Sequence, residues 1–357
     1  MALDPELTKD WLDFEQFKEK YQKVPVEEYP NNVLEAIPEP VVSVHIITYQ
    51  HVDYIRDAIE GVLMQKTDFP FEIIIGDDES NDGTREICIE YAEKYPDKIR
   101  LFLHKRENNI AILGKPSHIF QYSYNSFNLR GKYVAGCSGD DYWTDPLKLQ
   151  KQVEFMEGNE GYSMCFTDYS VIDSGNNIID EDPLQNEEKC SRDLVDILGY
   201  KRLPQALTVL IRASSHPTKF PSDFFKIISE DKFIYSLVCS QGKAFFMDFK
   251  SGYYRMHIGA INSMKSTEYR LKHAINTNKK LKNIFKEKRE SRAINYQNIK
   301  YYNTLFSIYY NEKRVFKFIC LNLNYIQISP LALLKKYKWL FLTVGKNTTS
   351  RFKKRPG

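Results

Sequence analysis

The sequence lacks several features that would assign it to a common class of protein. Its six cysteines lie far apart and form no CxxC pair, which argues against a zinc site and against the disulfide framework of a small secreted protein. No run reaches the roughly 18 uninterrupted apolar residues that a membrane-spanning helix needs, so we expect no such helix. Residues 1–21 are acidic and polar, so we expect no signal peptide.

Two common nucleotide-binding motifs are also missing. No GxGxxG sequence follows the first predicted strand, so we do not expect a dinucleotide-binding Rossmann site. The segment Gly114-Lys115-Pro116-Ser117 resembles the end of a P-loop, but Asn109 stands where the upstream glycine would be, and the proline prevents the helix start that the loop requires. A bound diphosphate would therefore be held mainly by a metal ion and a few cations, and Lys115 is a candidate for one of them.

A strong separation of charge is present instead. Residues 265–357 contain 22 Lys and Arg but only 4 Asp and Glu, whereas residues 1–264 contain 28 basic and 43 acidic residues. An acidic body with a basic tail indicates two different roles. The tail would suit an anionic membrane surface or an anionic acceptor, and nucleic acid is the other polyanion to consider.

The end of this basic tail has an amphipathic pattern. Residues 330–344 set leucines and a tryptophan around three lysines, and a basic cluster follows at 351–355. Charged residues so near the middle of this segment prevent it from spanning a membrane, but they fit a helix that lies in the plane of the membrane interface. The alternative is an ordinary packed helix with a solvated basic end.

The hydrophobic pattern predicts an α/β fold. Continuous apolar runs at 41–48, 71–76, 99–104 and 132–137 alternate with helical spacing at 52–65, 84–95 and 119–127. This alternation indicates a mostly parallel sheet covered by helices on both faces, with its ligand beyond the carboxyl ends of the strands. Residues 1–40 predict an N-terminal helical extension with a proline-rich connector, and residues 266–318 predict helices rich in Lys and Tyr.

Polar residues directly follow three of the predicted strands: Thr48-Tyr49, Asp77-Asp78 and Ser138-Gly139-Asp140-Asp141. Two acid pairs at one edge of a sheet would repel each other in an empty site. Asp also caps helices and forms turns, which could explain any single acid here. A divalent cation, or a ribose and uracil that offer hydrogen-bond donors, explains two adjacent pairs better.

The segments that carry these residues resemble a known family. VSVHIITYQHVDYIRDAIEGVLMQ, FEIIIGDDESNDGT and GKYVAGCSGDDYWTDPLKLQKQ, in this order, are similar to inverting glycosyltransferases of family 2, which have the GT-A fold. The resemblance implies a GT-A domain at 41–265, with a nucleotide-sugar half at 41–145 and an acceptor half at 146–265. It leaves 266–357 as a basic helical tail that could contact a membrane.

The resemblance implies roles for the residues at the first two strand ends. Thr48 and Tyr49 would line the uracil and the ribose of a UDP-sugar. Asp78 would bind the base, and Asp77 would support it.

The third strand end stands in the place of the family's metal-binding DxD motif. Ser138-Gly139-Asp140 has serine in place of the first acid, so Asp140 and Asp141 would share the contacts with the metal, Mn2+ or Mg2+, and with the ribose. Trp143 could stack on a sugar face.

Two further segments match the family on the acceptor side. Glu230-Asp231 stands in the place of an acidic motif whose Asp is the general base, and Glu230 would contact substrate beside it. A carboxylate opposite the leaving phosphate is what the reaction needs to take the proton of the acceptor hydroxyl. The alternative is an acid pair at a helix N-terminus, favoured by the helix dipole.

Tyr254-Arg255-Met256-His257 matches a Tyr-Arg-x-His segment in which the histidine can complete the metal shell. The resemblance implies that His257 is a metal ligand and that Arg255 contacts the substrate. A lone histidine is more often structural, which is the alternative.

The implied activity is metal-dependent, inverting transfer of a sugar from a nucleotide diphosphate to a glycan or lipid-linked acceptor in cell-surface polysaccharide synthesis. We expect a cytoplasmic protein in peripheral contact with the inner face of the membrane, and no nucleic acid partner. The alternative is a non-catalytic scaffold that binds a nucleotide or polyanion, favoured only by Ser138 and by the altered segment after His257. A nucleotidyltransferase would show a glycine-rich loop after the first strand, which residues 49–53 do not form.

Overall fold

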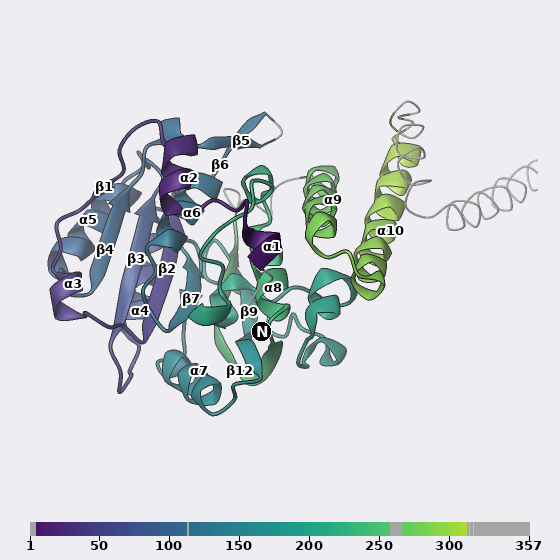
Figure 1. Ribbon diagram of the computed structural model, residues 1–357. Coiled ribbons are helices and arrows are strands. Elements are labelled where there is room, and N and C mark those ends of the chain that lie inside the picture. The colour runs from purple at the N-terminus through teal and green to yellow at the C-terminus, as the bar shows by residue number, and fades with distance from the viewer. Residues whose placement is uncertain (1–4, 113, 258–265, 313, 315–316, 318–357) are drawn as a thin grey trace, which may run out of the picture.

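The fold is known from a computed structural model that describes residues 5–112, 114–257, 266–312, 314 and 317 (Figure 1). Its centre is a ten-stranded sheet with the strand order β1-β4-β3-β2-β7-β11-β9-β12-β8, in which β10 pairs with β9. The strands of this sheet are β1 (Glu27–Glu28), β2 (Val42–Thr48), β3 (Phe71–Asp77), β4 (Ile99–Leu103), β7 (Tyr133–Ser138), β8 (Tyr142–Trp143), β9 (Tyr162–Asp173), β10 (Ile178–Asp180), β11 (Val209–Arg212) and β12 (Lys243–Met256). A separate hairpin pairs β5 (Ile110–Ile112) with β6 (Lys115–Ser117).

Four neighbouring strands, β4, β3, β2 and β7, run parallel, which confirms the prediction from their apolar runs. All seven residues of β3 are buried, as expected for a strand that is covered on both faces. The register places Thr48 beside Asp77 and Ile47 beside Ser138. The polar residues that follow these strands therefore meet at one edge of the sheet.

The other half of the sheet is mixed. β11 lies antiparallel between β7 and β9, while β12 runs parallel to β9 and antiparallel to β8. The pairing of Gly252 with Trp143 and of Tyr253 with Tyr142 brings the end of β12 back to the loop after β7. Residues more than 100 positions apart, such as Asp140 and His257, become neighbours in this way.

Helices cover both faces of the sheet, as predicted. α4 (Ile55–Leu63), α5 (Thr84–Lys94) and α7 (Lys148–Glu157) pack on one face, and α2 (Phe14–Tyr21), α6 (Ile119–Phe127) and α8 (Glu230–Cys239) pack on the other. In α4, Ile55, Ala58, Ile59 and Val62 have helical spacing and are fully buried, so that one face of the helix meets the sheet.

The remaining helical elements are short, apart from two C-terminal helices. They are α1 (Pro5–Thr8), α3 (Val33–Ala36), α9 (Thr267–Ile284), α10 (Lys288–Asn311), the π-helical turn η3 (Asp196–Tyr200), and the 3-10 turns η1 (Arg106–Asn108), η2 (Asn186–Glu188), η4 (Ala206–Thr208), η5 (Ala213–Ser215) and η6 (Phe224–Lys226). In the ranges that the structure describes, none of the helices combines the length and apolar character needed to cross a bilayer.

Figure 1 shows α9 and α10 side by side at one end of the molecule, which confirms that helices follow the sheet. They are joined to α8 through the buried side chain of Lys232. Its ammonium donates hydrogen bonds to the Leu198 carbonyl oxygen at 2.9 Å, to Asn278 Oδ1 in α9 at 2.5 Å, and to Gln297 Oε1 in α10. The two helices therefore support the helix that begins with Glu230 and Asp231. The amphipathic stretch predicted at 330–344 lies outside the described residues.

Candidate active site

A cleft lies at the carboxyl ends of β2 and β7, between these strands and the start of α8. Its lining includes residues that the sequence predicts for the site and two histidines that it does not: Thr48, Tyr49, His51, His118, Asp140, Asp141, Glu230 and Asp231. The cleft therefore brings the predicted metal-binding acids and the predicted general base into one space.

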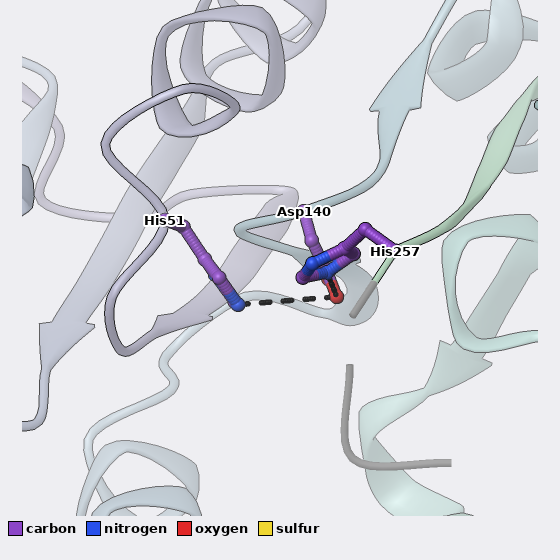
Figure 2. Close-up of side chains that lie close together, drawn as sticks. All are labelled: His51, Asp140 and His257. Carbon is purple, nitrogen blue, oxygen red and sulfur yellow. Dashed lines mark hydrogen bonds and ion pairs between the residues drawn. The ribbon is translucent and has the colours of Figure 1, made fainter. Parts of the chain in front are cut away.

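Three side chains in this region form a compact group with metal-ligating atoms. In Figure 2, His51, Asp140 and His257 come from three separate segments and converge. Their ligand atoms lie within 4.8 Å of one another. The Nε2 atom of His257 is 3.0 Å from Asp140 Oδ2, and that of His51 is 3.9 Å from the same oxygen.

This group fits a divalent cation in its donor chemistry. Two imidazoles and one carboxylate suit a divalent transition metal. Burial alone would raise the pKa of Asp140, but the hydrogen bond with His257 and the nearby His51 bring that pKa below its usual value. The carboxylate is thus ionised, which is the form that binds a cation. Thr48 Oγ1 lies 3.1 Å from His51 Nδ1 and orients the ring, as a second partner of a metal-binding histidine commonly does.

Gly139 allows the loop after β7 to approach these residues closely. A Cβ atom at this position would lie 2.6 Å from Thr48 Oγ1 and 2.9 Å from His51 Nδ1. We expect Gly139→Ala to displace Asp140 from His51 and to weaken Mn2+ binding by about 10- to 100-fold, the range for changes next to a metal ligand. Titration calorimetry with Mn2+ measures this, and Gly161→Ala is the control because a Cβ there meets nothing within 4 Å. Equal Mn2+ affinity of the two variants would contradict the prediction.

Asp141 points differently from its neighbour. Its Oδ1 atom accepts a hydrogen bond from the backbone N–H of Arg255 at 2.9 Å. The Arg255 side chain is buried and donates to the Asp140 carbonyl oxygen at 2.9 Å and to Asp57 Oδ2 at 2.9 Å. Through these hydrogen bonds, Asp141 and Arg255 connect the end of β12 to the loop that carries Asp140. A role for Asp141 in metal binding and for Arg255 in substrate binding remains a prediction.

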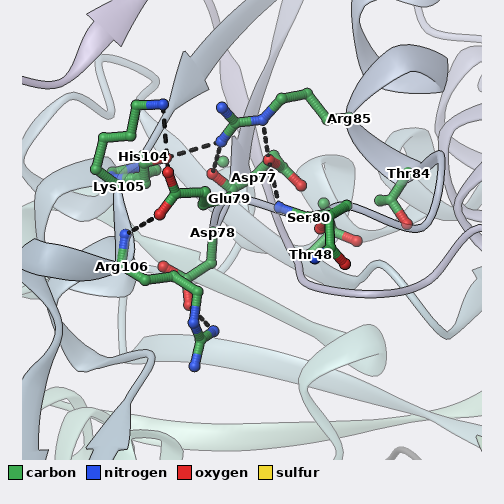
Figure 3. Close-up of polar contacts among 12 residues, drawn as sticks. Thr48, Asp77, Asp78, Glu79, Ser80, Thr84, Arg85, His104, Lys105 and Arg106 are labelled. Carbon is green, nitrogen blue, oxygen red and sulfur yellow. Dashed lines mark hydrogen bonds and ion pairs between the residues drawn. The ribbon is translucent and has the colours of Figure 1, made fainter.

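The acids after β3 occupy a second polar region, shown in Figure 3. Asp77 is fully buried, and its Oδ2 atom accepts hydrogen bonds from Arg85 Nε at 2.5 Å and from the backbone N–H of Ser80 at 3.2 Å. These contacts fix the loop that carries Asp78, which fits the supporting role predicted for Asp77.

Asp78 lies beside a cation and an aromatic ring. Its Oδ2 atom accepts hydrogen bonds from Arg106 Nη1 at 2.8 Å and from Asn109 Nδ2 at 2.9 Å. Burial raises the pKa of Asp78 to about 6, although the Asn109 hydrogen bond and the Arg106 charge oppose the shift. The Arg106 guanidinium lies 4.0 Å from the centre of the Tyr49 ring, which is partly exposed. An aromatic face, a carboxylate and a guanidinium together could hold a planar base.

The other acid pair stands at the start of α8. Glu230 accepts a hydrogen bond at Oε1 from His118 Nε2, 2.9 Å away, and both side chains are largely buried. Burial and the neighbouring Glu230 raise the pKa of Asp231 to about 7, while His118 lowers it. A carboxylate that titrates near neutral pH is suited to accept a proton there.

Two predicted residues lie neither in the lining of this cleft nor among the polar contacts described above. Trp143 is 1% exposed, and its indole N–H donates to the Leu207 carbonyl oxygen at 2.8 Å within the core. Lys115 lies exposed on β6, with its ammonium 5.7 Å from the centre of the Tyr269 ring. We therefore assign neither residue a contact with the sugar or the diphosphate.

Three residues of the site were missed at the sequence level. His51 follows Thr48 by three positions in the same loop, so the strand-end argument could have included it. Arg106 and His118 carry no local signal, because each reaches its acidic partner through contacts between distant segments.

Comparison with known proteins shows a similarity to one family. The model of Glycosyl transferase family 2 matches residues 43–202. Over these residues the chain is similar to this family. An uncharacterized protein of Mycobacterium tuberculosis is 42% identical over 130 residues, which are 36% of this chain and 35% of that protein. TuaG of Bacillus subtilis, named provisionally as a teichuronic acid biosynthesis glycosyltransferase, is 36% identical over 134 residues, 38% of this chain and 48% of that protein. The chain thus spans about a third to a half of these relatives.

Solved structures show that the chain has the predicted GT-A fold. S. aureus TarS 1-349, in complex with UDP-GlcNAc, has a TM-score of 0.58 and 18% identity, and covers 82% of each chain. The mannosyltransferase PcManGT from Pyrobaculum calidifontis, in complex with GDP-Man and Mn2+, has a TM-score of 0.50 and 15% identity, and covers 91% of this chain and 86% of its own.

Proposed function

We propose that this chain transfers a sugar from a nucleotide diphosphate, a UDP-sugar, to a hydroxyl of a glycan or lipid-linked acceptor, with inversion at the anomeric carbon and with a divalent metal. The single observation that carries the proposal is the pair of acidic centres in one cleft. Asp140, with two histidines, can hold a metal ion, while Asp231 can accept a proton across the same space.

The donor nucleotide would bind at the ends of β2 and β3. The base would rest against Tyr49, with Asp78 accepting a hydrogen bond from the base and Arg106 holding that carboxylate in place. Thr48, at the end of β2, would lie beside the ribose. When bound by His51, Asp140 and His257, Mn2+ or Mg2+ would supply positive charge to the diphosphate of the leaving nucleotide.

The transfer would be a single displacement. Asp231 would take the proton of the acceptor hydroxyl as its oxygen forms a bond to C1 of the sugar. The bond between C1 and the diphosphate oxygen would break at the same time, and the electron pair would leave with the nucleotide. Because attack comes from the face opposite the leaving group, an α-linked donor would give a β-linked product.

Similar proteins support the class of substrate. TarS binds UDP-GlcNAc and PcManGT binds GDP-Man with Mn2+, both on the same fold. TuaG is named, provisionally, for teichuronic acid biosynthesis. Proton NMR of the product tests the stereochemical part of the proposal: a β coupling constant from an α donor agrees with a single displacement, and an α product contradicts it.

The tail supports a peripheral place at the cytoplasmic face of the membrane. Residues 330–357 contain eight Lys and Arg and no acid. Each cation near an anionic bilayer contributes on the order of 1 kcal/mol, and the apolar side chains add burial. We expect a chain truncated after Ser329 to stay folded and turn over donor slowly, but to be released from anionic vesicles.

Vesicle co-sedimentation at low and high salt measures this release. The binding of the full chain should weaken as salt rises, because exposed charges are screened beyond about 10 Å at 0.1 M salt. Equal sedimentation of both forms would show that the tail is only a solvated surface.

A further inference from the structure

His118 contacts an acidic residue on the other side of the cleft, although it belongs to none of the motifs found in the sequence. It lies directly before α6, and it contacts the first residue of α8, 112 positions further along the chain. We propose that His118 is a positioning residue, which pairs with Glu230 and so leaves Asp231 as the single proton acceptor of the cleft. This inference rests on the proposed role of Asp231 as the general base.

The geometry separates the two adjacent acids. Glu230 Oε1 is 2.9 Å from His118 Nε2, and the two side chains are 12% and 13% exposed. Asp231 also lines the cleft, and no side chain in the described part of the molecule donates a hydrogen bond to it. Of two neighbouring carboxylates, one is therefore held in an ion pair and the other is available to a substrate hydroxyl.

His118 and Asp231 each affect the pKa of the other. Burial lowers the pKa of His118, but Glu230, Asp78 and Asp231 together raise it above its usual value. The imidazolium in turn lowers the pKa of Asp231 against the opposing effects of burial and Glu230. Other titratable groups that act on Asp231 are Asp141 in the loop after β7, Tyr122 in α6 and Tyr235 in α8. His45 in β2 and His216 line a cavity together with Asp231, and burial lowers the pKa of His45 to about 3 and that of His216 to about 4.

Two substitutions of His118 distinguish a charge effect from a packing effect. Glutamine keeps a hydrogen-bond donor but removes the positive charge, while lysine keeps the charge. Below the pKa of Asp231 the base is protonated and the transfer rate falls, so kcat/KM has an acid limb. We expect His118→Gln to move this limb about one pH unit higher, which is a tenfold lower rate at a fixed acidic pH. We expect His118→Lys to leave the limb where it is in the unmodified chain.

The control is His273→Gln, which changes a buried histidine of α9 and should not move the limb. An unmoved limb in His118→Gln, or equal shifts in the glutamine and lysine variants, would overturn the proposal. A uniform loss of rate at every pH would show that His118 only supports the fold.

A second measurement does not depend on sugar transfer. Carbon-13 NMR of labelled aspartate carboxyls, with the Asp231 signal assigned from Asp231→Asn, gives the midpoint of its titration directly. The midpoint should rise by about one pH unit in His118→Gln. If it does so in a chain that turns over no donor, the proposed function fails while the role of His118 stands. If the midpoint stays in place, the inference fails whatever the activity.

Discussion

Asp231→Asn is expected to bind the nucleotide sugar with unchanged affinity and to lose transfer by about 10²- to 10⁴-fold. The amide keeps the shape of the side chain at the start of α8 but cannot accept a proton. Tyr49 and Asp78, which we propose bind the donor, lie on other elements, so the substitution leaves them intact. Calorimetry with the nucleotide sugar and a rate assay on the same variant measure both quantities.

Asp97→Asn is the matched control, because Asp97 is exposed on the turn before β4 and its change should affect neither quantity. Reduced donor affinity with an unchanged transfer rate would show that Asp231 is a binding residue and not the base.

Asp140→Ala is expected to lower metal-dependent transfer by at least about 100-fold, the scale for removal of one preorganised charge partner. The carboxylate lies between His51 and His257, so its loss also removes the single anionic member of that group. Mn2+ affinity should fall together with the rate, and titration calorimetry of the free protein measures that affinity without any turnover.

We expect a loss of similar size for Asp141→Ala, through a different contact. Its carboxylate holds the backbone N–H of Arg255, two residues before His257. Asp97→Ala serves again as the exposed control. Near-normal rates of both cleft variants with Mn2+ present would show that the metal site has been assigned wrongly.

The parallel half of the sheet could be predicted because its information is local. A run such as 71–76 is mostly apolar and directly precedes two acids, which indicates both a buried strand and the end of it that faces a ligand. Thr48, Asp78 and Asp140 follow from the same argument. Their proximity is then a consequence of parallel pairing in register.

The mixed half could not be predicted in this way. The insertion of β11 between β7 and β9 and the return of β12 to β8 depend on pairing between distant segments, which no local pattern encodes. These pairings place His257 beside Asp140 and bury Trp143 against Leu207. A sequence-level argument could name His257 only through resemblance to a family, and it had no means of separating a stacking tryptophan from a core one.

The most direct test of the central claim is donor turnover by the full chain. Nucleotide release is measured across UDP-, GDP- and dTDP-sugars, with Mn2+ and with EDTA, in the unmodified chain and in Asp140→Ala. The account predicts release from a UDP-sugar that depends on Mn2+ and is reduced by at least about 100-fold in the variant. Nucleotide binding without release from any donor, in the presence of Mn2+, would contradict it and would favour a non-catalytic scaffold.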